Sequence, residues 1–310
     1  MDRLEAMALL LTVVEKGSLS AAGRALHVPL ATLSRKLSDL ENLLGARLLM
    51  RTTRKLSLTD AGIAYVAAAR RILEQVDEAE RDAAGEFTEP KGELAITAPL
   101  MFGRLHLLPI VADFLAAHDA ITVRLILADR NVDLVGDHVD MALRIGTLPD
   151  SAMVATQVGT MRMVCCASPA LLAIHGMPDV PADLQRHPCV AVDTPMPVPS
   201  WRFRDPASGA ALDIAIAPRL AVTTPEAAAD AATLGVGIVR VLHYQVADAV
   251  RRGALAVMLE AFEPEAAPVH LVHAARGQMP LKMRRFLDFA APRLRERLRN
   301  IASTRPANSA

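Results

Sequence analysis

The sequence predicts an α+β protein with a small helical domain at its N-terminus, a long helix, and a larger α/β body. Three observations support this fold class. Apolar residues recur at helical spacing through about the first 45 positions. Residues 60–87 contain no proline, and from residue 94 onward short strand-like runs alternate with helical patterns. At 310 residues the chain is long enough for two domains.

Charge is distributed unevenly along a chain whose net charge is zero. The 34 basic and 34 acidic side chains cancel, which excludes a uniformly basic nucleic-acid coat, and 52% apolar residues exclude a disordered chain. Residues 1–62 nevertheless hold nine basic and six acidic side chains, whereas residues 63–90 hold three and seven. A small basic domain is therefore followed by an acidic connector.

The cysteines and the N-terminus predict a cytoplasmic protein without a membrane span. Cys165, Cys166 and Cys189 are an odd number, which does not suit a disulfide framework. We expect buried, inert thiols, with a redox switch involving Cys189 as the alternative. The first residues lack the basic segment and cleavage site of a signal peptide, and no apolar run reaches the roughly 18–20 residues that span a bilayer.

Three short helices are predicted in the first 45 residues. An apolar stripe runs through residues 4–14, Gly17 ends this helix, and Ser18 caps the next one. His27-Val28-Pro29 breaks the chain before a third helix, which Gly45 ends. The inner face of the third helix carries Leu33, Leu37, Leu40 and Leu44.

The outer face of the third helix is polar and basic. A helix, a tight turn and a helix with such a face form the helix-turn-helix pattern, which places the second helix in the major groove of DNA. Residues 47–50 and 55–58 predict a short hairpin, or wing. The predicted DNA contacts are Ala31, Thr32, Ser34, Arg35 and Lys36 on the helix, and Arg51, Thr52, Thr53 and Arg54 on the wing. The alternative is a solvated charged face on a small helical domain.

A helix of about 28 residues is predicted from Asp60 to Phe87, with Thr59 as its cap. Its apolar residues follow the alternating spacing of four and three that is typical of a coiled coil, with Glu80 as a departure. Such a seam needs a partner, most simply a second copy of the chain. The predicted dimerisation residues are Val66, Ala69, Leu73 and Val76.

The body alternates strands with helices, which predicts an α/β fold with mostly parallel sheets. Residues 94–97, 121–127, 141–145 and 163–167 are strand-like, and residues 103–118 are helical. Among the nine histidines and three cysteines we find no metal-ligand spacing, and no nucleophile elbow or Walker loop occurs. These features predict no metal, no cofactor and no enzymatic activity.

The N-terminal motif resembles a known family. The run GSLSAAGRALHVPLATLSRKLSDLENLLGARLLMRTTRKLSLTDAG looks like the signature of the LysR-type transcriptional regulators. The segments GELAITAPLMFGRLHLLP, VDMALRIGTLPDS and VCCASPALLAIHG are similar to the sensing domain of one subgroup, so the resemblance covers nearly the whole chain. Val28-Pro29-Leu30 departs from the family pattern, which usually has valine, serine and a polar residue there.

The resemblance implies a division into domains. The sensing domain is expected to have two lobes, like a periplasmic solute-binding protein, with a small-molecule effector between them. The implied boundaries are a winged helix-turn-helix over 1–62 with its reading motif at about 19–38, a linker and dimerisation helix over 60–89, a sensing domain over 91–302, and a tail over 303–310. Lobe I would take about 91–160 and 269–302, and lobe II about 161–268.

The resemblance also places an effector pocket at the carboxyl ends of parallel strands. The implied contacts are Thr97, Ala98, Pro99, Leu100, Met101, Phe102, Arg144, Ile145, Gly146, Thr223, Thr224 and Gly237. Arg144 could clamp a carboxylate, which makes a small organic carboxylate the expected effector. An ion pair of Arg144 with Asp140 or Asp129 is an equally weighted alternative.

These expectations combine into one hypothesis. The chain would be a cytoplasmic regulator that binds an inverted-repeat operator in double-stranded DNA as a dimer, within a homotetramer, and whose DNA bending responds to a small molecule. RNA polymerase would be a further partner. The alternatives are a solute-binding protein without a DNA function and an enzyme with an accessory helical domain.

Overall fold

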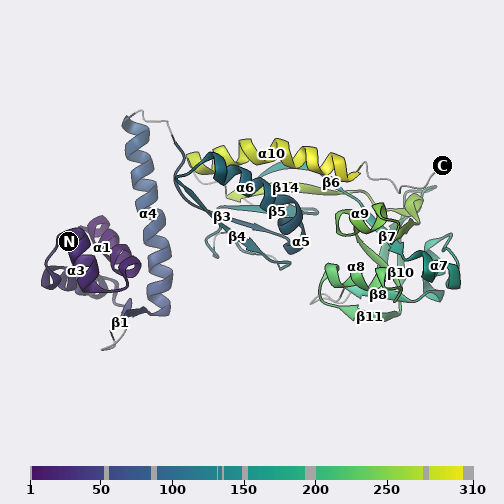
Figure 1. The fold of residues 1–310 in the computed structure, drawn as a ribbon, viewed down its shortest axis with the longest axis horizontal. Helices are drawn as coiled ribbons and strands as arrows, with labels where there is room; N and C mark the ends of the chain where they lie inside the picture. Colours follow the sequence, from purple (N-terminus) through teal and green to yellow (C-terminus); the bar gives the residue numbers. More distant parts are fainter. Residues whose placement is uncertain are drawn as a thin grey trace. The chain divides into compact units, whose positions relative to one another are not determined.

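The computed structural model describes residues 2–51, 56–84, 89–130, 132–134, 136–148, 153–192, 200–274 and 279–302. The chain forms two compact units, Met1–Glu89 and Pro90–Ala310 (Figure 1). Each unit has its own apolar core.

The first unit begins with the three predicted short helices, which are α1 (Arg3–Lys16), α2 (Leu19–Leu26) and α3 (Leu30–Leu44). The predicted caps are confirmed. Gly17 ends α1 in the left-handed conformation, and the Ser18 hydroxyl accepts a hydrogen bond from the Ala21 amide at the start of α2. Gly45 ends α3 in the same left-handed way as Gly17. Local sequence signals thus set the ends of these helices.

A short hairpin and the long helix complete the first unit. Strands β1 (Leu49–Arg51) and β2 (Leu56–Leu58) pair antiparallel, and α4 runs over Asp60–Ala84. Thr59 caps α4, because its hydroxyl accepts from the Gly62 amide at 2.9 Å. The same hydroxyl donates to the Arg47 carbonyl at 2.6 Å, which ties the start of α4 to the start of the wing.

The predicted coiled-coil seam is partly occupied by the chain's own core. Val66 is 9% exposed and Ala69 is fully buried, and Val66 belongs to the core that α1 and α3 form. The prediction that these two residues face a second chain is therefore wrong. The spacing of apolar residues was identified correctly, but the same spacing serves a helix that packs against α1 of its own chain. Leu73 and Val76, further along α4, are half-buried.

Gly62 lets α4 approach the wing closely. A Cβ atom at this position would lie 2.1 Å from the carbonyl oxygen of Leu48 and 3.0 Å from the Leu58 side chain. The backbone of Leu48 cannot yield without moving β1. The glycine therefore positions the wing against the base of α4.

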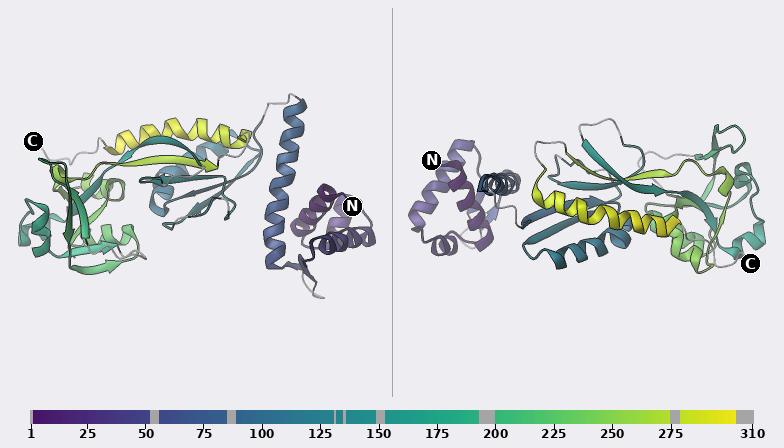
Figure 2. Two further views of the ribbon diagram at one scale, coloured as in Figure 1. Left: turned by 180° about the vertical axis from the view of Figure 1, so that it is seen from behind. Right: turned by 90° about the horizontal axis from the view of Figure 1, so that it is seen from above.

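The second unit contains two five-stranded sheets. The first has the order β4-β3-β5-β14-β6, and we call the part built on it lobe I. Its strands are β3 (Gly92–Ala98), β4 (Ile121–Leu127), β5 (Met141–Ile145), β6 (Met153–Met161) and β14 (Ala267–Ala274). Helices α6 (Leu108–Ala117) and α10 (Leu281–Ala302) lie side by side on one face of this sheet (Figure 2), where Phe114 and Phe286 meet edge to face at 5.1 Å.

Lobe II is built on the second sheet, of order β11-β8-β12-β7-β13. Its strands are β7 (Met163–Ala167), β8 (Cys189–Val192), β11 (Pro218–Val222), β12 (Ile238–Leu242) and β13 (Ala256–Met258). Its helices are α7 (Pro169–His175), α8 (Pro225–Thr233) and α9 (His243–Arg251), with 3-10 turns η2 (Pro181–Arg186) and η3 (Glu260–Phe262). A separate hairpin joins β9 (Ser200–Arg204) to β10 (Ala211–Ala215).

The expectation of mostly parallel sheets is wrong. In lobe I, β3 runs parallel to β4 and β5, but β14 runs antiparallel to β5 and β6. In lobe II, β8 runs parallel to β11 and β12, whereas β7 runs antiparallel to both of its neighbours, β12 and β13. Strands β7 and β14, which run antiparallel to their neighbours, are the first strands after the two places where the chain passes between the lobes.

One apolar helical run meets the length and composition of a membrane span, contrary to the expectation from sequence. It covers Leu100–Ala117 and consists of α5 (Leu100–Phe102), the π-helical turn η1 (Gly103–Leu107) and α6. A core helix meets the same criterion, and Ile110 and Phe114 of this run are fully buried in the core of lobe I. We therefore assign it as a core helix.

The tight contact at Gly62 leads to a prediction about the first unit. Gly62→Ala should destabilise that unit by ~1–3 kcal/mol, the usual cost of forcing an extra methyl group into a packed site. Hydrogen exchange of the full chain, followed by mass spectrometry, should show faster exchange in residues 30–84 and unchanged exchange in residues 90–302. Ala61→Ser, at an exposed neighbouring position, is the matched control. Wild-type exchange in Gly62→Ala would contradict the assigned role.

Candidate nucleic-acid interface and effector site

The outer face of α3 is presented to solvent as a mixed polar surface. Ala31 and Arg35 are exposed, and Thr32 and Ser34 are half-buried beside them. Pro29 occupies the N-cap position and makes no side-chain cap hydrogen bond. Because proline also lacks an amide hydrogen, the start of α3 offers fewer donors than a serine cap would. Arg35 is therefore the most prominent candidate for reading bases on this helix.

Lys36 is held within the chain. Its ammonium group forms an ion pair with Glu5 of α1, and its side chain is about one-third exposed. The structure thus places this predicted DNA contact where it also joins α3 to α1. The nearby Glu5 carboxylate offsets the positive charge of Lys36, which weakens the attraction of Lys36 to a DNA phosphate.

Glu41 belongs to the family-like N-terminal run, but the sequence did not predict a structural role for its carboxylate. It is 8% exposed, and its carboxylate accepts hydrogen bonds from the amides of Leu48 at 2.8 Å and Leu49 at 3.0 Å. These bonds join α3 to the first strand of the wing. The signal was present in the spacing, since Glu41 follows Leu37 by four residues and so falls on the inner face of α3.

The wing is described only in part. Arg51 is the last residue of β1, where its backbone pairs with Leu56. The predicted contacts Thr52, Thr53 and Arg54 lie outside the residues that the structure describes. The antiparallel pairing of β1 with β2 agrees with a hairpin at this place.

The loop after β3, which contains several of the predicted effector contacts, is more tightly packed than the sequence suggests. Ala98 and Phe102 are fully buried in the core of lobe I, so the prediction that they contact an effector is wrong. The Phe102 ring lies edge to face against Tyr244 of α9, with centroids 5.1 Å apart. The Leu100 amide donates to the Asp129 carboxylate at 3.0 Å. Pro99 occupies the N-cap position of the following turn without a side-chain hydrogen bond, and Met101 packs against the same core.

Three polar side chains share one face of the lobe I sheet, opposite α6 and α10. Thr97 pairs with Ala142, and Arg144, two residues further along β5, lies directly opposite His270 of β14. Because paired residues and residues two apart point to the same face, Thr97, Arg144 and His270 lie on that face together. The Thr97 hydroxyl and the Nδ1 atom of His270 are buried without a hydrogen-bond partner.

Arg144 is half-buried and donates to the Val132 carbonyl at 2.7 Å. Burial lowers the pKa of its guanidinium. The two acids that were considered as its partners accept backbone hydrogen bonds, Asp140 from Ala95 at 2.8 Å and Asp129 from Leu100. Sequence reasoning missed His270, which lies on the returning strand and becomes a neighbour of Arg144 only through the order of the sheet.

Backbone requirements explain two of the predicted glycines. Gly146 follows Ile145 at the end of β5 with a φ of 115°, a left-handed conformation that favours glycine. A Cβ atom at Gly237 would lie 2.7 Å from the Pro188 carbonyl oxygen. Gly237 therefore allows close packing within lobe II, and its contact with an effector stays a prediction.

The two threonines from lobe II differ in their surroundings. Thr223 is exposed, whereas the hydroxyl of Thr224 caps α8 by accepting from the Ala227 amide at 3.2 Å. The N-terminal turn of α8 also carries Glu226, which forms an ion pair with Arg104 of lobe I. Thr223 is thus the threonine whose side chain is presented to solvent.

The three cysteines are buried in lobe II. Burial raises the pKa of Cys166 to about 12 and that of Cys189 to about 11, and it raises the pKa of Cys165 as well. Thiolate, the reactive form, is therefore scarce at neutral pH.

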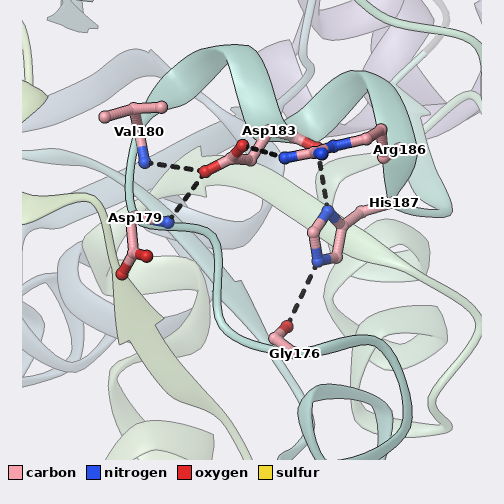
Figure 3. A network of polar contacts seen from close by, with 6 residues as sticks. All are labelled: Gly176, Asp179, Val180, Asp183, Arg186 and His187. Carbon is pink, nitrogen blue, oxygen red and sulfur yellow. Dashed lines mark hydrogen bonds and ion pairs between the residues drawn. The ribbon is translucent and has the colours of Figure 1, made fainter.

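A polar network holds the segment between α7 and η2 in lobe II (Figure 3). The Asp183 carboxylate accepts from the amides of Asp179 and Val180, and His187 lies between the carbonyls of Asp183 and Gly176. The backbone hydrogen bond from Val180, followed by Arg186, lowers the pKa of Asp183. This network contains none of the predicted contact residues, so we assign it a role in folding.

Comparison with known proteins assigns both parts of the chain to known domain families. Residues 4–63 match the model of the bacterial regulatory helix-turn-helix protein, lysR family, and residues 87–295 match the LysR substrate binding domain. An HTH-type transcriptional repressor of Pseudomonas aeruginosa is 34% identical, covering 93% of this chain and 91% of its own length.

Solved structures show the same architecture. CrgA, a LysR-type regulator from Neisseria meningitidis, matches with a TM-score of 0.60 and 31% identity over 94% of this chain and 98% of its own. LysG from Corynebacterium glutamicum, described with bound effector Arg, matches with a TM-score of 0.56 and 22% identity over 95% and 98%. The chain is a member of the LysR family of DNA-binding transcriptional regulators, with an effector-binding domain.

Proposed function

We propose that the protein binds an inverted-repeat operator as a dimer, within a homotetramer, and that a small organic effector changes how it bends that DNA. The observation that carries the proposal is the exposed outer face of α3, with Arg35, in a chain that also has a two-lobed sensing unit. It would act in the cytoplasm as a regulator, with RNA polymerase as a further partner and without enzymatic activity. Residues 1–62 would bind DNA, 60–89 would dimerise, and 91–302 would sense.

The second copy of the chain would meet the far half of α4. At 25 residues α4 is longer than α1, which has 14, and it extends beyond the three short helices (Figure 1). Leu73 and Val76 lie in this half, and the neighbouring Ile72 is exposed. Val66 and Ala69 would support dimerisation only indirectly, by fixing α4 on its own domain.

The effector would be a small carboxylate held between the lobes, with its main polar contacts in lobe I. Arg144 supplies a guanidinium, and Thr97 and His270 supply polar atoms that are buried without partners on the same sheet face. A carboxylate accepts from all three groups, which would satisfy buried atoms that are otherwise costly. Leu100 and Thr223, both exposed to solvent, would complete the site.

The assignment of the reading helix predicts different effects for two adjacent residues. Arg35→Ala should weaken operator binding by ~1–3 kcal/mol, as expected for a lost base contact, whereas Lys36→Ala should have a smaller effect because Glu5 already engages Lys36. The measurement is fluorescence anisotropy on a duplex selected from random sequences by the wild-type protein. Equal, unchanged affinities in both variants would contradict the assignment of α3.

The dimer proposal predicts that Leu73→Asp yields smaller species. A carboxylate in an apolar interface costs several kcal/mol of association, roughly the cost of an unpaired buried charge. Analytical ultracentrifugation of the full chain should detect this change, and operator affinity should fall with it. Gln75→Asp, at an exposed position of the same helix, is the control. A wild-type mass for Leu73→Asp would place dimerisation elsewhere.

The effector proposal predicts that Arg144→Ala and His270→Ala each lose carboxylate binding. The loss should be ~1.5–3 kcal/mol, the scale of a hydrogen bond to a charged group, with basal DNA binding retained. Aromatic and short aliphatic carboxylates would be screened by thermal shift, and the best one measured by calorimetry. Arg124→Ala, an exposed arginine on β4 of the same sheet, is the control. Wild-type affinity in Arg144→Ala would make Arg144 structural.

A further inference from the structure

The chain passes between the two lobes at two neighbouring places. Strand β6 of lobe I ends at Met161 and β7 of lobe II begins at Met163, so Arg162 is the single residue of the first crossing. The second crossing leads from β13 through η3 and Glu263 back to β14. Met161 pairs with Ala267 at the end of the β6–β14 ladder, so the two crossings run side by side.

The Arg162 side chain joins these two crossings. Its Nε atom lies 2.7 Å from Oε2 of Glu263, and its Nη2 atom lies 2.7 Å from Oε1 of the same carboxylate. The Nη2 atom also donates to Oε2 of Glu260 at 2.6 Å. A bidentate pair of this kind fixes orientation as well as distance, because the two planar groups must stay aligned.

The position of this cluster favours a strong interaction. The Glu263 side chain is 13% exposed, whereas that of Glu260 is 62% exposed. Coulombic attraction is screened less where solvent is excluded, so Glu263 should contribute more than Glu260. The hydrogen bonds that Arg162 donates to Glu263 raise the pKa of Arg162, in keeping with a permanently charged clamp.

The backbone of Arg162 links the crossing to α9. Its carbonyl accepts from the amide of His243, the first residue of that helix, at 2.9 Å. Burial lowers the pKa of His243, and the Arg162 charge lowers it further, so this neighbour stays neutral. The next residue, Tyr244, belongs to lobe II but is buried in the core of lobe I against Phe102. A rotation of the backbone at Arg162 would therefore also move the contact between Tyr244 and Phe102.

We propose that Arg162, Glu263 and Glu260 form a hinge clamp that sets the angle between the two lobes. Each crossing would otherwise rotate about its own backbone bonds, and the clamp makes both rotate together. Arg162 acts as a positioning residue, because its side-chain hydrogen bonds go to Glu260 and Glu263 and not to the proposed effector site. The inference does not depend on the identity of the effector, so it can fail while the proposed function stands.

The test measures the distance between the lobes in the full chain without any effector. Spin labels would be attached at Ala117→Cys in lobe I and Leu234→Cys in lobe II, two exposed positions. The native thiols are buried and need no removal. Labelled protein would be diluted into unlabelled protein, so that double electron–electron resonance reports distances within one chain.

Arg162→Met should broaden or displace the distance distribution, Glu263→Gln should do so to a similar degree, and Glu260→Gln should do so less. The matched control is Arg202→Met, which removes a two-bond pair with Asp213 inside the β9–β10 hairpin of lobe II. Since Glu260 is largely exposed, its variant should fold even if Arg162→Met does not. Distributions that superimpose on the wild type in Glu263→Gln and Glu260→Gln would overturn the proposal, as would an equal change in Arg202→Met.

Discussion

The second unit depends on one constraint, which is that the lobe I sheet is completed by a strand that follows all of lobe II in the sequence. Strand β14 inserts between β5 and β6, yet more than a hundred residues separate β6 from β14 along the chain. Helix α10, which follows β14, supplies Phe286 and Leu294 to the core of lobe I. The core of lobe I is therefore assembled from distant segments, and contacts of this kind are slow to form because a long loop must close first.

Because of the same constraint, few residues determine the angle between the two lobes. Among the described residues, the lobes are connected by the two crossings, by Tyr244 of α9 against Phe102 and His106, by the packing of α9 on α10, and by the ion pair of Arg104 with Glu226. Exposed ion pairs contribute little, so the buried contacts should dominate. A sensing unit of this design can change shape by altering a small number of interactions, without unfolding either core.

The first unit is stabilised in a different way, because its apolar core is small. Glu41 places a carboxylate inside that core, where an unpaired charge would be strongly destabilising. Two backbone amides of the wing donate hydrogen bonds to this carboxylate, and the same bonds position the wing against α3. Helix α4 then covers the remaining apolar surface with Val66 and Ala69. The position of the exposed face of α3 relative to the wing thus depends on residues that are buried in the first unit.

The sequence by itself determined the local features of this protein. Helix ends at Gly17 and Gly45, caps at Ser18 and Thr59, and the polar face of α3 depend on residues within a turn or two of each other, so they can be inferred from spacing. The tertiary structure decided the rest. Only the order of the sheet brings His270 opposite Arg144, and only the packing of α4 on α1 turns Val66 from a seam residue into a core residue. Apolar periodicity shows that a face is buried but not what buries it, because the hydrophobic effect is non-directional and any apolar partner satisfies it.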